Sequence, residues 1–200
     1  MIPNQEKYQV IVIGGSAGAM TVLVELLPGF PADFPLPIVI AVHLHPRQDS
    51  AHIERLAGLC ALKVKEADEK EPIQSGGVYL APPNYHLLIE NDRTFSLSID
   101  ERVNYARPAI DVLFETAAQV YGPQTIGVVL TGANNDGAQG LRLIKDRGGL
   151  TVVQDPETAE SAYMPRAALE ATSVDHVLSV PEIGKLLVKI PLKSPLHAGA

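Results

Sequence analysis

The sequence has one cysteine, no surplus of basic residues and no long apolar run. Cys60 alone cannot form an intramolecular disulfide, which is typical of a protein kept in a reducing cytoplasm. The 16 basic and 23 acidic residues give a net charge of −7, the wrong sign for binding a phosphate backbone, and this excludes nucleic acid as a partner. No apolar stretch reaches the ~18 residues of a membrane span, and the N-terminus lacks a signal-peptide pattern. We therefore predict a soluble cytoplasmic protein.

The composition is that of a globular chain. Hydrophobic residues make up 46% and charged residues 20% of the sequence, a balance that excludes disorder as the main state. A chain of 200 residues can bury one sizeable core, and it contains neither an internal repeat nor a linker-like boundary. We predict one domain over residues 1–190, followed by a flexible tail at residues 191–200.

Buried strands alternate with amphipathic helices through most of the chain. A run rich in β-branched residues at 9–13 is followed by a helical pattern at 19–27. A second such run at 37–42 is followed by a helical pattern that ends at about residue 62, and Asp49 and Ser50 are candidates for its N-cap. The pattern resumes with helices at 108–121, 138–146, 164–171 and 181–188, and strands at 125–130, 150–153 and 176–180. This alternation predicts an α/β fold whose parallel strands are joined by crossover helices.

The middle of the chain has a different spacing. Four short strand candidates are separated there by Gly-Gly, Pro-Pro-Asn and Asn-Asp turns; they cover residues 64–66, 78–81, 86–90 and 94–99. Short strands at such turns favour hairpins. We therefore predict an antiparallel hairpin excursion on the main sheet.

Three predicted strands end in polar residues: Ser16 after the first, His43 after the second and Asp136 after the strand at 125–130. Ligands of open α/β sheets bind beyond the carboxyl ends of the strands, so the three side chains could converge there. A serine hydroxyl is too weakly acidic to attack unaided, whereas an imidazole oriented by a carboxylate can take its proton. The Gly14-x-Ser16-x-Gly18 turn also fits a nucleophile elbow, although the chain order Ser, His, Asp differs from that of ordinary α/β-hydrolases.

The residues alone leave other interpretations open. Dinucleotide binding is disfavoured, because Ser16 occupies the second glycine position of G-x-G-x-x-G and the expected acid is missing from the next strand end. Ser16 and Asp136 could merely cap helices. His43 and His45 could be metal ligands, with Asp136 or His86 completing the site.

Several longer motifs occur in order along the chain. They are IGGSAG at 13–18, VH at 42–43, VYLAP at 78–82, NYH at 84–86, RPAIDVLF at 107–114, LTGANNDG at 130–137 and MPRAA at 164–168. Together they resemble the catalytic domain of chemotaxis protein-glutamate methylesterases, the CheB family, from about residue 10 to residue 188. The resemblance implies a doubly wound, mainly parallel α/β sheet with helices on both faces.

The resemblance also implies an activity. Enzymes of this family hydrolyse glutamate γ-methyl esters on chemoreceptor helices and release methanol, and some deamidate receptor glutamines. Here it places the nucleophile at Ser16, the base at His43, the orienting acid at Asp136 and the oxyanion donors at the backbone amides of Ala17 and Ala133. It implies no cofactor and no metal. The expected partners are methylated chemoreceptor helices, with contact to the membrane only through the receptor.

Two loops depart from the family pattern. In the first loop the family usually has Ser-Thr-Gly-Gly, whereas this chain has Ser-Ala-Gly-Ala at 16–19, so that Ala17 and Ala19 differ. In the second loop the family commonly has Met-Gly before Asn-Asp-Gly, whereas this chain has Ala133 and Asn134. These departures leave two alternative hypotheses: a catalytically weak or inactive docking or regulatory protein, and a related esterase with a non-receptor substrate.

The family usually carries a receiver domain ahead of the esterase. This sequence begins only about eight residues before the first predicted strand. We expect one of two cases. The chain is either a stand-alone esterase or a piece of a longer protein. A stand-alone esterase would be free of receiver control, or it would be controlled in trans by a receiver or signalling protein.

Overall fold

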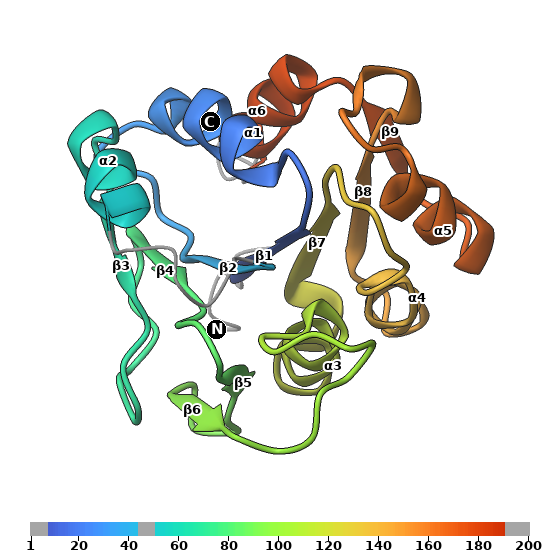
Figure 1. Ribbon diagram of the computed structural model, residues 1–200. Helices are drawn as coiled ribbons and strands as arrows, with labels where there is room; N and C mark the ends of the chain where they lie inside the picture. Colours follow the sequence, from blue (N-terminus) through green and yellow to red (C-terminus); the bar gives the residue numbers. More distant parts are fainter. Residues whose placement is uncertain (1–7, 44–50, 191–200) are drawn as a thin grey trace, which may run out of the picture.

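The computed structural model describes residues 8–43 and 51–190, and within them a parallel sheet lies between two layers of helices (Figure 1). The seven strands of this sheet follow the order β3-β4-β2-β1-β7-β8-β9. Their bounds are β1 Val10–Gly15, β2 Ile38–Val42, β3 Lys63–Glu66, β4 Gly77–Leu80, β7 Thr125–Val129, β8 Leu150–Gln154 and β9 His176–Leu178. The predicted α/β fold with a mainly parallel sheet is confirmed.

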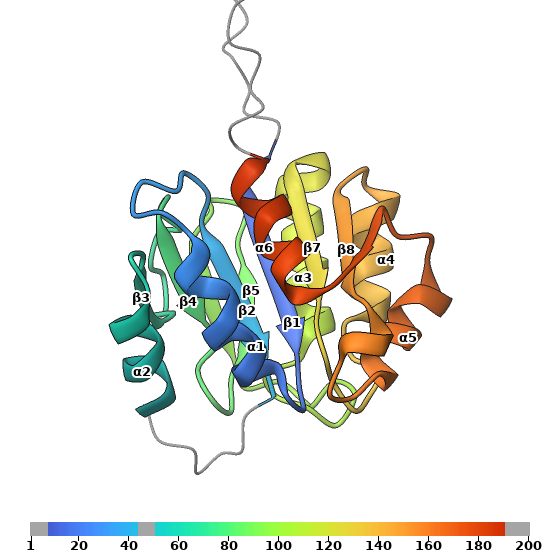
Figure 2. The same cartoon turned by 90° about the horizontal axis from the view of Figure 1, so that it is seen from above.

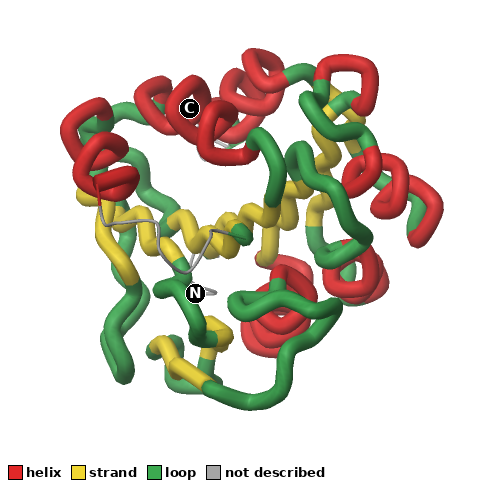
Figure 3. The backbone as a smooth tube through the Cα atoms, viewed as in Figure 1, coloured by secondary structure: helices red, strands yellow, loops and turns green. Residues whose placement is uncertain are grey.

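Each face of the sheet has its own hydrophobic core because its central strands are apolar on both sides. Along β1, Ile11 and Ile13 point into one core, whereas Val10 and Val12 point into the other. Helices α1 (Ala19–Leu26), α2 (Ala51–Leu59) and α6 (Val180–Lys189) cover the first face. Helices α3 (Ile110–Tyr121), α4 (Ala138–Asp146) and α5 (Tyr163–Ala171) cover the second (Figures 2 and 3).

The middle of the chain is divided between two sheets, where we predicted one excursion on the main sheet. Strands β3 and β4 pair in parallel and belong to the main sheet, since β4 is buried along its whole length and therefore suits a position inside the sheet. Among the strands of the described residues, only β5 (His86–Ile89) and β6 (Phe95–Ser98) pair in antiparallel fashion, and they form a separate two-stranded sheet. The hairpin buries Leu87 and Phe95 in the core beneath α3.

Some predicted boundaries shift. The helix predicted to start at Pro108 begins at Ile110, because Ala109 is still extended. Helix α2 ends at Leu59 rather than near residue 62. The N-cap candidates Asp49 and Ser50 and the tail at 191–200 lie outside the described residues. None of the helices in the described ranges is long and apolar enough to span a membrane.

The strand order reverses at the centre of the sheet. From β1 the chain moves outward on one side through β2, and it later returns through β7 on the other side of β1. Such a switch point opens a crevice at the carboxyl ends of the strands, where α/β proteins bind their ligands. Ser16 follows β1, His43 follows β2 and Asp136 lies in the loop after β7, so all three are placed at this crevice.

Candidate active site

Backbone hydrogen bonds fix the ends of the three central strands relative to one another. The N–H of Ser16 donates to the carbonyl of Thr131 at 2.9 Å, and the N–H of His43 donates to the carbonyl of Gly15 at 3.2 Å. Gly14 is required by close packing, because a Cβ at this position would collide with the side chain of Ile110. The serine therefore leaves the sheet at a defined point between the loops after β2 and β7.

Ser16 lies in the turn between β1 and α1 and is half-buried. Helix α1 has Gly18, at a φ of 80°, as its N-cap residue, and no side chain makes a capping hydrogen bond. Ser16 is thus not the helix cap that one alternative suggested. Its hydroxyl is left available at the crevice.

His43 and Asp136 are in direct contact. The imidazole Nε2 lies 2.7 Å from Oδ2 of Asp136, and the His43 side chain is 14% exposed whereas that of Asp136 is completely buried. The base is thus shielded from most solvent contact but still reachable from the crevice. This contact joins two residues that are 93 positions apart in the sequence.

Asp136 sits against the N-terminus of α3 rather than capping its own helix α4. Its carboxylate accepts hydrogen bonds from the backbone N–H groups of Ile110 at 2.7 Å and Asp111 at 3.1 Å, and from Nδ2 of Asn104 at 2.9 Å. Burial alone would raise the pKa of Asp136, but the hydrogen bonds from His43 and from these three groups outweigh it and hold the pKa below its ordinary value. The group is a carboxylate at neutral pH.

This carboxylate determines which tautomer His43 adopts. An ionised Asp136 only accepts hydrogen bonds, so Nε2 of the neutral imidazole must carry the proton, and Nδ1 carries the lone pair. Nδ1 is therefore the basic nitrogen of the site. Within the described residues no hydrogen bond joins Nδ1 to the hydroxyl of Ser16; the two residues are linked through the Gly15 backbone.

Two backbone donors at the crevice lack an acceptor. Neither the N–H of Ala17 nor that of Ala133 donates to any acceptor within residues 8–43 and 51–190, and both residues are exposed. Ala17 directly follows the serine, and Ala133 lies in the loop after β7. Free N–H groups in these places are the donor type that an oxyanion hole requires.

Thr131 joins the loops that carry these two donors. It is fully buried, and its hydroxyl donates to the carbonyl of Ala17 at 2.9 Å while accepting from the N–H of Ser161 at 2.9 Å. Its own N–H donates to Oε1 of Gln154 at 2.8 Å. The threonine hydroxyl therefore holds the carbonyl of Ala17, and through it the turn that carries the Ala17 N–H.

We expect Thr131→Val to lower kcat for ester hydrolysis between about tenfold and a hundredfold. The variant releases the carbonyl of Ala17, and so loosens the turn that carries the Ala17 N–H, while it nearly preserves the shape of the side chain. It should also cost about 1–3 kcal/mol of stability for each buried group left unpaired. Steady-state kinetics and denaturant unfolding measure the two effects. Thr131→Ser keeps the hydroxyl and serves as the control, and equal loss in both variants would contradict this role.

Asn104 is a site residue that sequence reasoning missed. Its Nδ2 donates both to Oδ1 of Asp136 at 2.9 Å and to Oδ2 of Asp111 at 2.8 Å, so one amide bridges two carboxylates. Burial raises the pKa of Asp111, and the nearby charge of Asp136 raises it further, while the hydrogen bond from the Gly140 N–H opposes this rise in part. Asn104 has a φ of 51°, a conformation that asparagine tolerates better than most residues.

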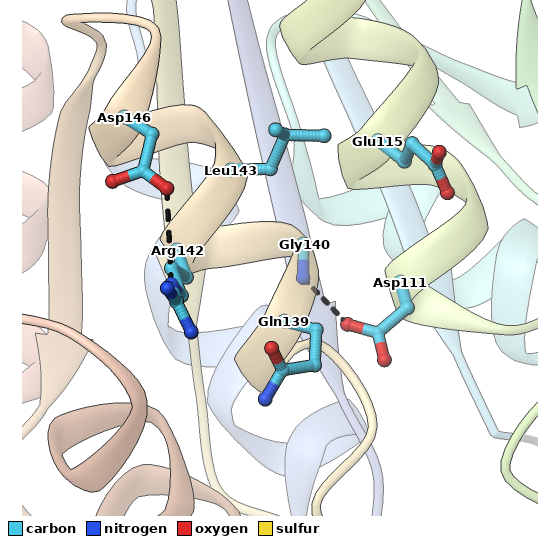
Figure 4. Close-up of a pocket in the computed structure, with 7 residues that line it drawn as sticks. All are labelled: Asp111, Glu115, Gln139, Gly140, Arg142, Leu143 and Asp146. Carbon is cyan, nitrogen blue, oxygen red and sulfur yellow. Dashed lines mark hydrogen bonds and ion pairs between the residues drawn. The ribbon is translucent and has the colours of Figure 1, made fainter.

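Asp111 also faces a groove between α3 and α4. This groove has a volume of about 330 Å³, and in Figure 4 the Asp111 carboxylate accepts from the Gly140 N–H at its edge, opposite the Arg142–Asp146 ion pair. None of Ser16, His43 or Asp136 lines it. The cavity at the crevice is smaller, about 210 Å³, and His43 is one of its walls. Its other lining residues are Arg102, Asn104, Tyr105, Ala106, Arg107, Pro108 and Asn134.

His86 and Arg107 anchor loops. Nε2 of His86 lies 3.0 Å from the carbonyl of Glu101, and its Nδ1 accepts from the N–H of Ala109. Arg107 donates to the carbonyls of Ile99 and Asp100. No group of three or more potential metal-ligating side chains occurs among the described residues, and His45 of the metal alternative lies outside them.

Comparisons with known proteins identify relatives over most of the chain. A protein of Leptospira interrogans serogroup Icterohaemorrhagiae is 60% identical over 183 residues, which cover 92% of this chain and 95% of that protein. A protein-glutamate methylesterase/protein-glutamine glutaminase of Archaeoglobus fulgidus is 36% identical over 90% of this chain and 52% of its own length. The chain thus spans about half the length of the archaeal relative and nearly all of the leptospiral one.

A solved structure gives the same result. The crystal structure of the Thermotoga maritima CheB methylesterase catalytic domain matches with a TM-score of 0.87 at 34% sequence identity, over 92% of this chain and 98% of that one. The sequence also matches the family described as CheB methylesterase over residues 11–187. Because the family match covers most of the chain and the solved structure has the same fold, the chain belongs to the CheB methylesterase family.

Proposed function

We propose that this protein is a protein-glutamate methylesterase that hydrolyses γ-methyl esters of chemoreceptor glutamates and releases methanol. One observation carries the proposal: a buried, ionised Asp136 holds His43 in the tautomer whose unprotonated nitrogen, Nδ1, is basic, beside the strand end that presents Ser16. Relatives with the matching domain are named for this activity.

In the acylation step Ser16 Oγ attacks the ester carbonyl while its proton moves to Nδ1 of His43. The resulting imidazolium is stabilised through its Nε2–H by the Asp136 carboxylate, 2.7 Å away. The negative charge that develops on the carbonyl oxygen is met by the backbone N–H groups of Ala17 and Ala133. When the tetrahedral intermediate collapses, His43 returns the proton to the leaving methoxide, so that methanol departs and the glutamyl group remains as an ester on Ser16.

In the deacylation step water replaces the alcohol. Nδ1 of His43 takes a proton from the water as its oxygen attacks the acyl carbonyl, and then returns that proton to Ser16 Oγ as the serine leaves. The products are a receptor glutamate and the free enzyme. The same sequence applied to a glutamine side chain releases ammonia, which fits the joint esterase and glutaminase names of the relatives.

The departures from the family pattern do not remove any of these chemical groups. At Ala17 and Ala133 the proposed donors are backbone N–H groups, which every residue except proline supplies. This favours an active enzyme over a docking or regulatory protein that binds without turnover. We place the enzyme in the cytoplasm, acting on methylated receptor helices and reaching the membrane only through them, with a receiver or signalling protein as a partner in trans.

The test combines turnover with labelling. Incubated with receptor membranes carrying radiolabelled methyl groups, the wild-type protein should release volatile methanol, and a fluorophosphonate should modify the peptide that contains Ser16, as located by mass spectrometry. Small methyl esters offered at equal concentration separate a receptor enzyme from a general esterase. Binding of methylated receptor without methanol release or labelling would contradict the proposal and support the docking alternative.

A further inference from the structure

Asn134, one of the departures from the family pattern, contacts the catalytic base directly. Its Nδ2 lies 3.3 Å from Nδ1 of His43, and its Oδ1 accepts from the N–H of Asp136 at 3.1 Å. The backbone contact fixes the orientation of the amide, because only the oxygen can accept from that N–H. The NH₂ group is therefore the end that faces the imidazole.

This contact uses the lone pair that the reaction needs. With the ring proton on Nε2, the only acceptor of His43 is the single in-plane lone pair of Nδ1. An N–H from Asn134 and the hydroxyl of Ser16 cannot both donate to it with good geometry. The amide is not required to select the tautomer either, since the ionised Asp136 already does so.

We propose that Asn134 is a positioning residue that occupies the basic nitrogen of His43 in the resting site and must withdraw before Ser16 can be deprotonated. The inference rests on the proposed function of Ser16 and His43. Asn134 and His43 line the same cavity of about 210 Å³, so the amide has space to move away when a substrate enters. The residue thereby lowers the reactivity of the free enzyme toward small electrophiles.

Asn134→Ser tests the inference with little change to the loop. A serine hydroxyl can still accept from the N–H of Asp136, as serine does in turns, but it is too short to reach the imidazole. Fluorophosphonate labelling of the full chain should become faster by about twofold to tenfold, the effect of losing one ordinary hydrogen bond. In this labelling Ser16 Oγ bonds to phosphorus, fluoride leaves, and the serine proton passes to Nδ1. Asn135→Ser, at the exposed neighbouring position, is the matched control and should label at the wild-type rate.

Two further measurements separate this role from a structural one. The ¹⁵N resonance of His43 Nδ1 should move to lower field in Asn134→Ser, as for an imidazole nitrogen that no longer accepts a hydrogen bond. Asn134→Asp keeps an acceptor for the Asp136 N–H but presents a carboxylate oxygen to Nδ1, which favours a proton there. This variant should label more slowly than the wild type.

The outcomes are distinguishable. Faster labelling of Asn134→Ser and slower labelling of Asn134→Asp, at unchanged thermal midpoints, support the inference. Unchanged labelling of Asn134→Ser overturns the inference and leaves Asn134 a purely structural role. Slower labelling also overturns it, and would show that Asn134 assists the deprotonation of Ser16. A wild-type protein that neither labels at Ser16 nor releases methanol overturns the proposed function, and the inference falls with it.

Discussion

Replacing Ser16 by alanine should lower the rate of methanol release from methylated receptor by about a millionfold. Removing the nucleophile abolishes the acyl-enzyme route, and what remains is the contribution of binding and of the oxyanion donors, on the order of a thousandfold over water. In the described structure the hydroxyl of Ser16 makes no hydrogen bond and the side chain is half-buried, so the variant should fold normally. Release of labelled methanol under single-turnover conditions measures the effect.

A second serine provides the control. Ser75 is exposed in the turn before β4, at the end of the parallel strands opposite to the one that carries the site, and Ser75→Ala should keep full activity. The thermal midpoints of both variants should lie within a few degrees of the wild type. If Ser16→Ala retained more than about one hundredth of the wild-type rate, the serine mechanism would be wrong, since no positioning effect leaves so much activity once the nucleophile is gone.

The sheet was predictable where strands are apolar on both faces. Strands β1, β2 and β7 are rich in β-branched residues and contain no charged ones, and such runs indicate interior parallel strands without any tertiary information. Strand β3 has no such pattern: it reads Lys-Val-Lys-Glu, with one buried residue, and its alternation fits an antiparallel edge as well as a parallel one. Its direction follows from the crossover through α2, which its four residues do not encode.

For the site, the sequence locates the loops but not the contacts between them. Ser16, His43 and Asp136 are found because polar residues at strand ends share one edge of a parallel sheet. That Asp136 receives its hydrogen bonds from the first turn of α3 depends on how this helix packs, since Ile110 is 26 positions away. Asn104 was missed for the same reason, because nothing near it in the sequence indicates that it bridges the carboxylates of Asp111 and Asp136.

The bridging by Asn104 has a consequence for catalysis. Asp136 is buried and Asp111 is half-buried, and two negative charges so close disfavour each other's ionisation. Asp136 has the larger set of donors, including His43 and two helical N–H groups, and it is the one whose pKa is lowered while that of Asp111 is raised. The negative charge is therefore stabilised on Asp136, the carboxylate that contacts His43.

Replacing Asp136 by asparagine should lower kcat for methanol release by about ten-thousandfold. The neutral amide cannot stabilise the imidazolium that forms during proton transfer, and when its NH₂ faces Nε2 the ring proton is forced to Nδ1, where it blocks the base. Comparing the loss in kcat with that in KM identifies the cause, since substrate binding should change little. Asp111→Asn is the control, because this carboxyl does not touch His43, and its loss should be far smaller.

The same variant should also change how stability depends on pH. Because the pKa of Asp136 is lower in the folded protein than in the unfolded chain, its ionised form stabilises the fold above the usual carboxyl range, and this stabilisation is lost as the pH falls through the lowered folded pKa. In Asp136→Asn the amide NH₂ meets the N–H of either Ile110 or Asp111 whichever way it points, so the variant should unfold more easily at pH 7. The difference in free energy of unfolding between wild type and variant should narrow below about pH 4, because the unfolded wild-type chain then binds a proton at Asp136 before the folded protein does, and the variant has no such group. Denaturant unfolding at a series of pH values measures this difference, and a constant gap from pH 7 to pH 2 would show that Asp136 is not held as a carboxylate.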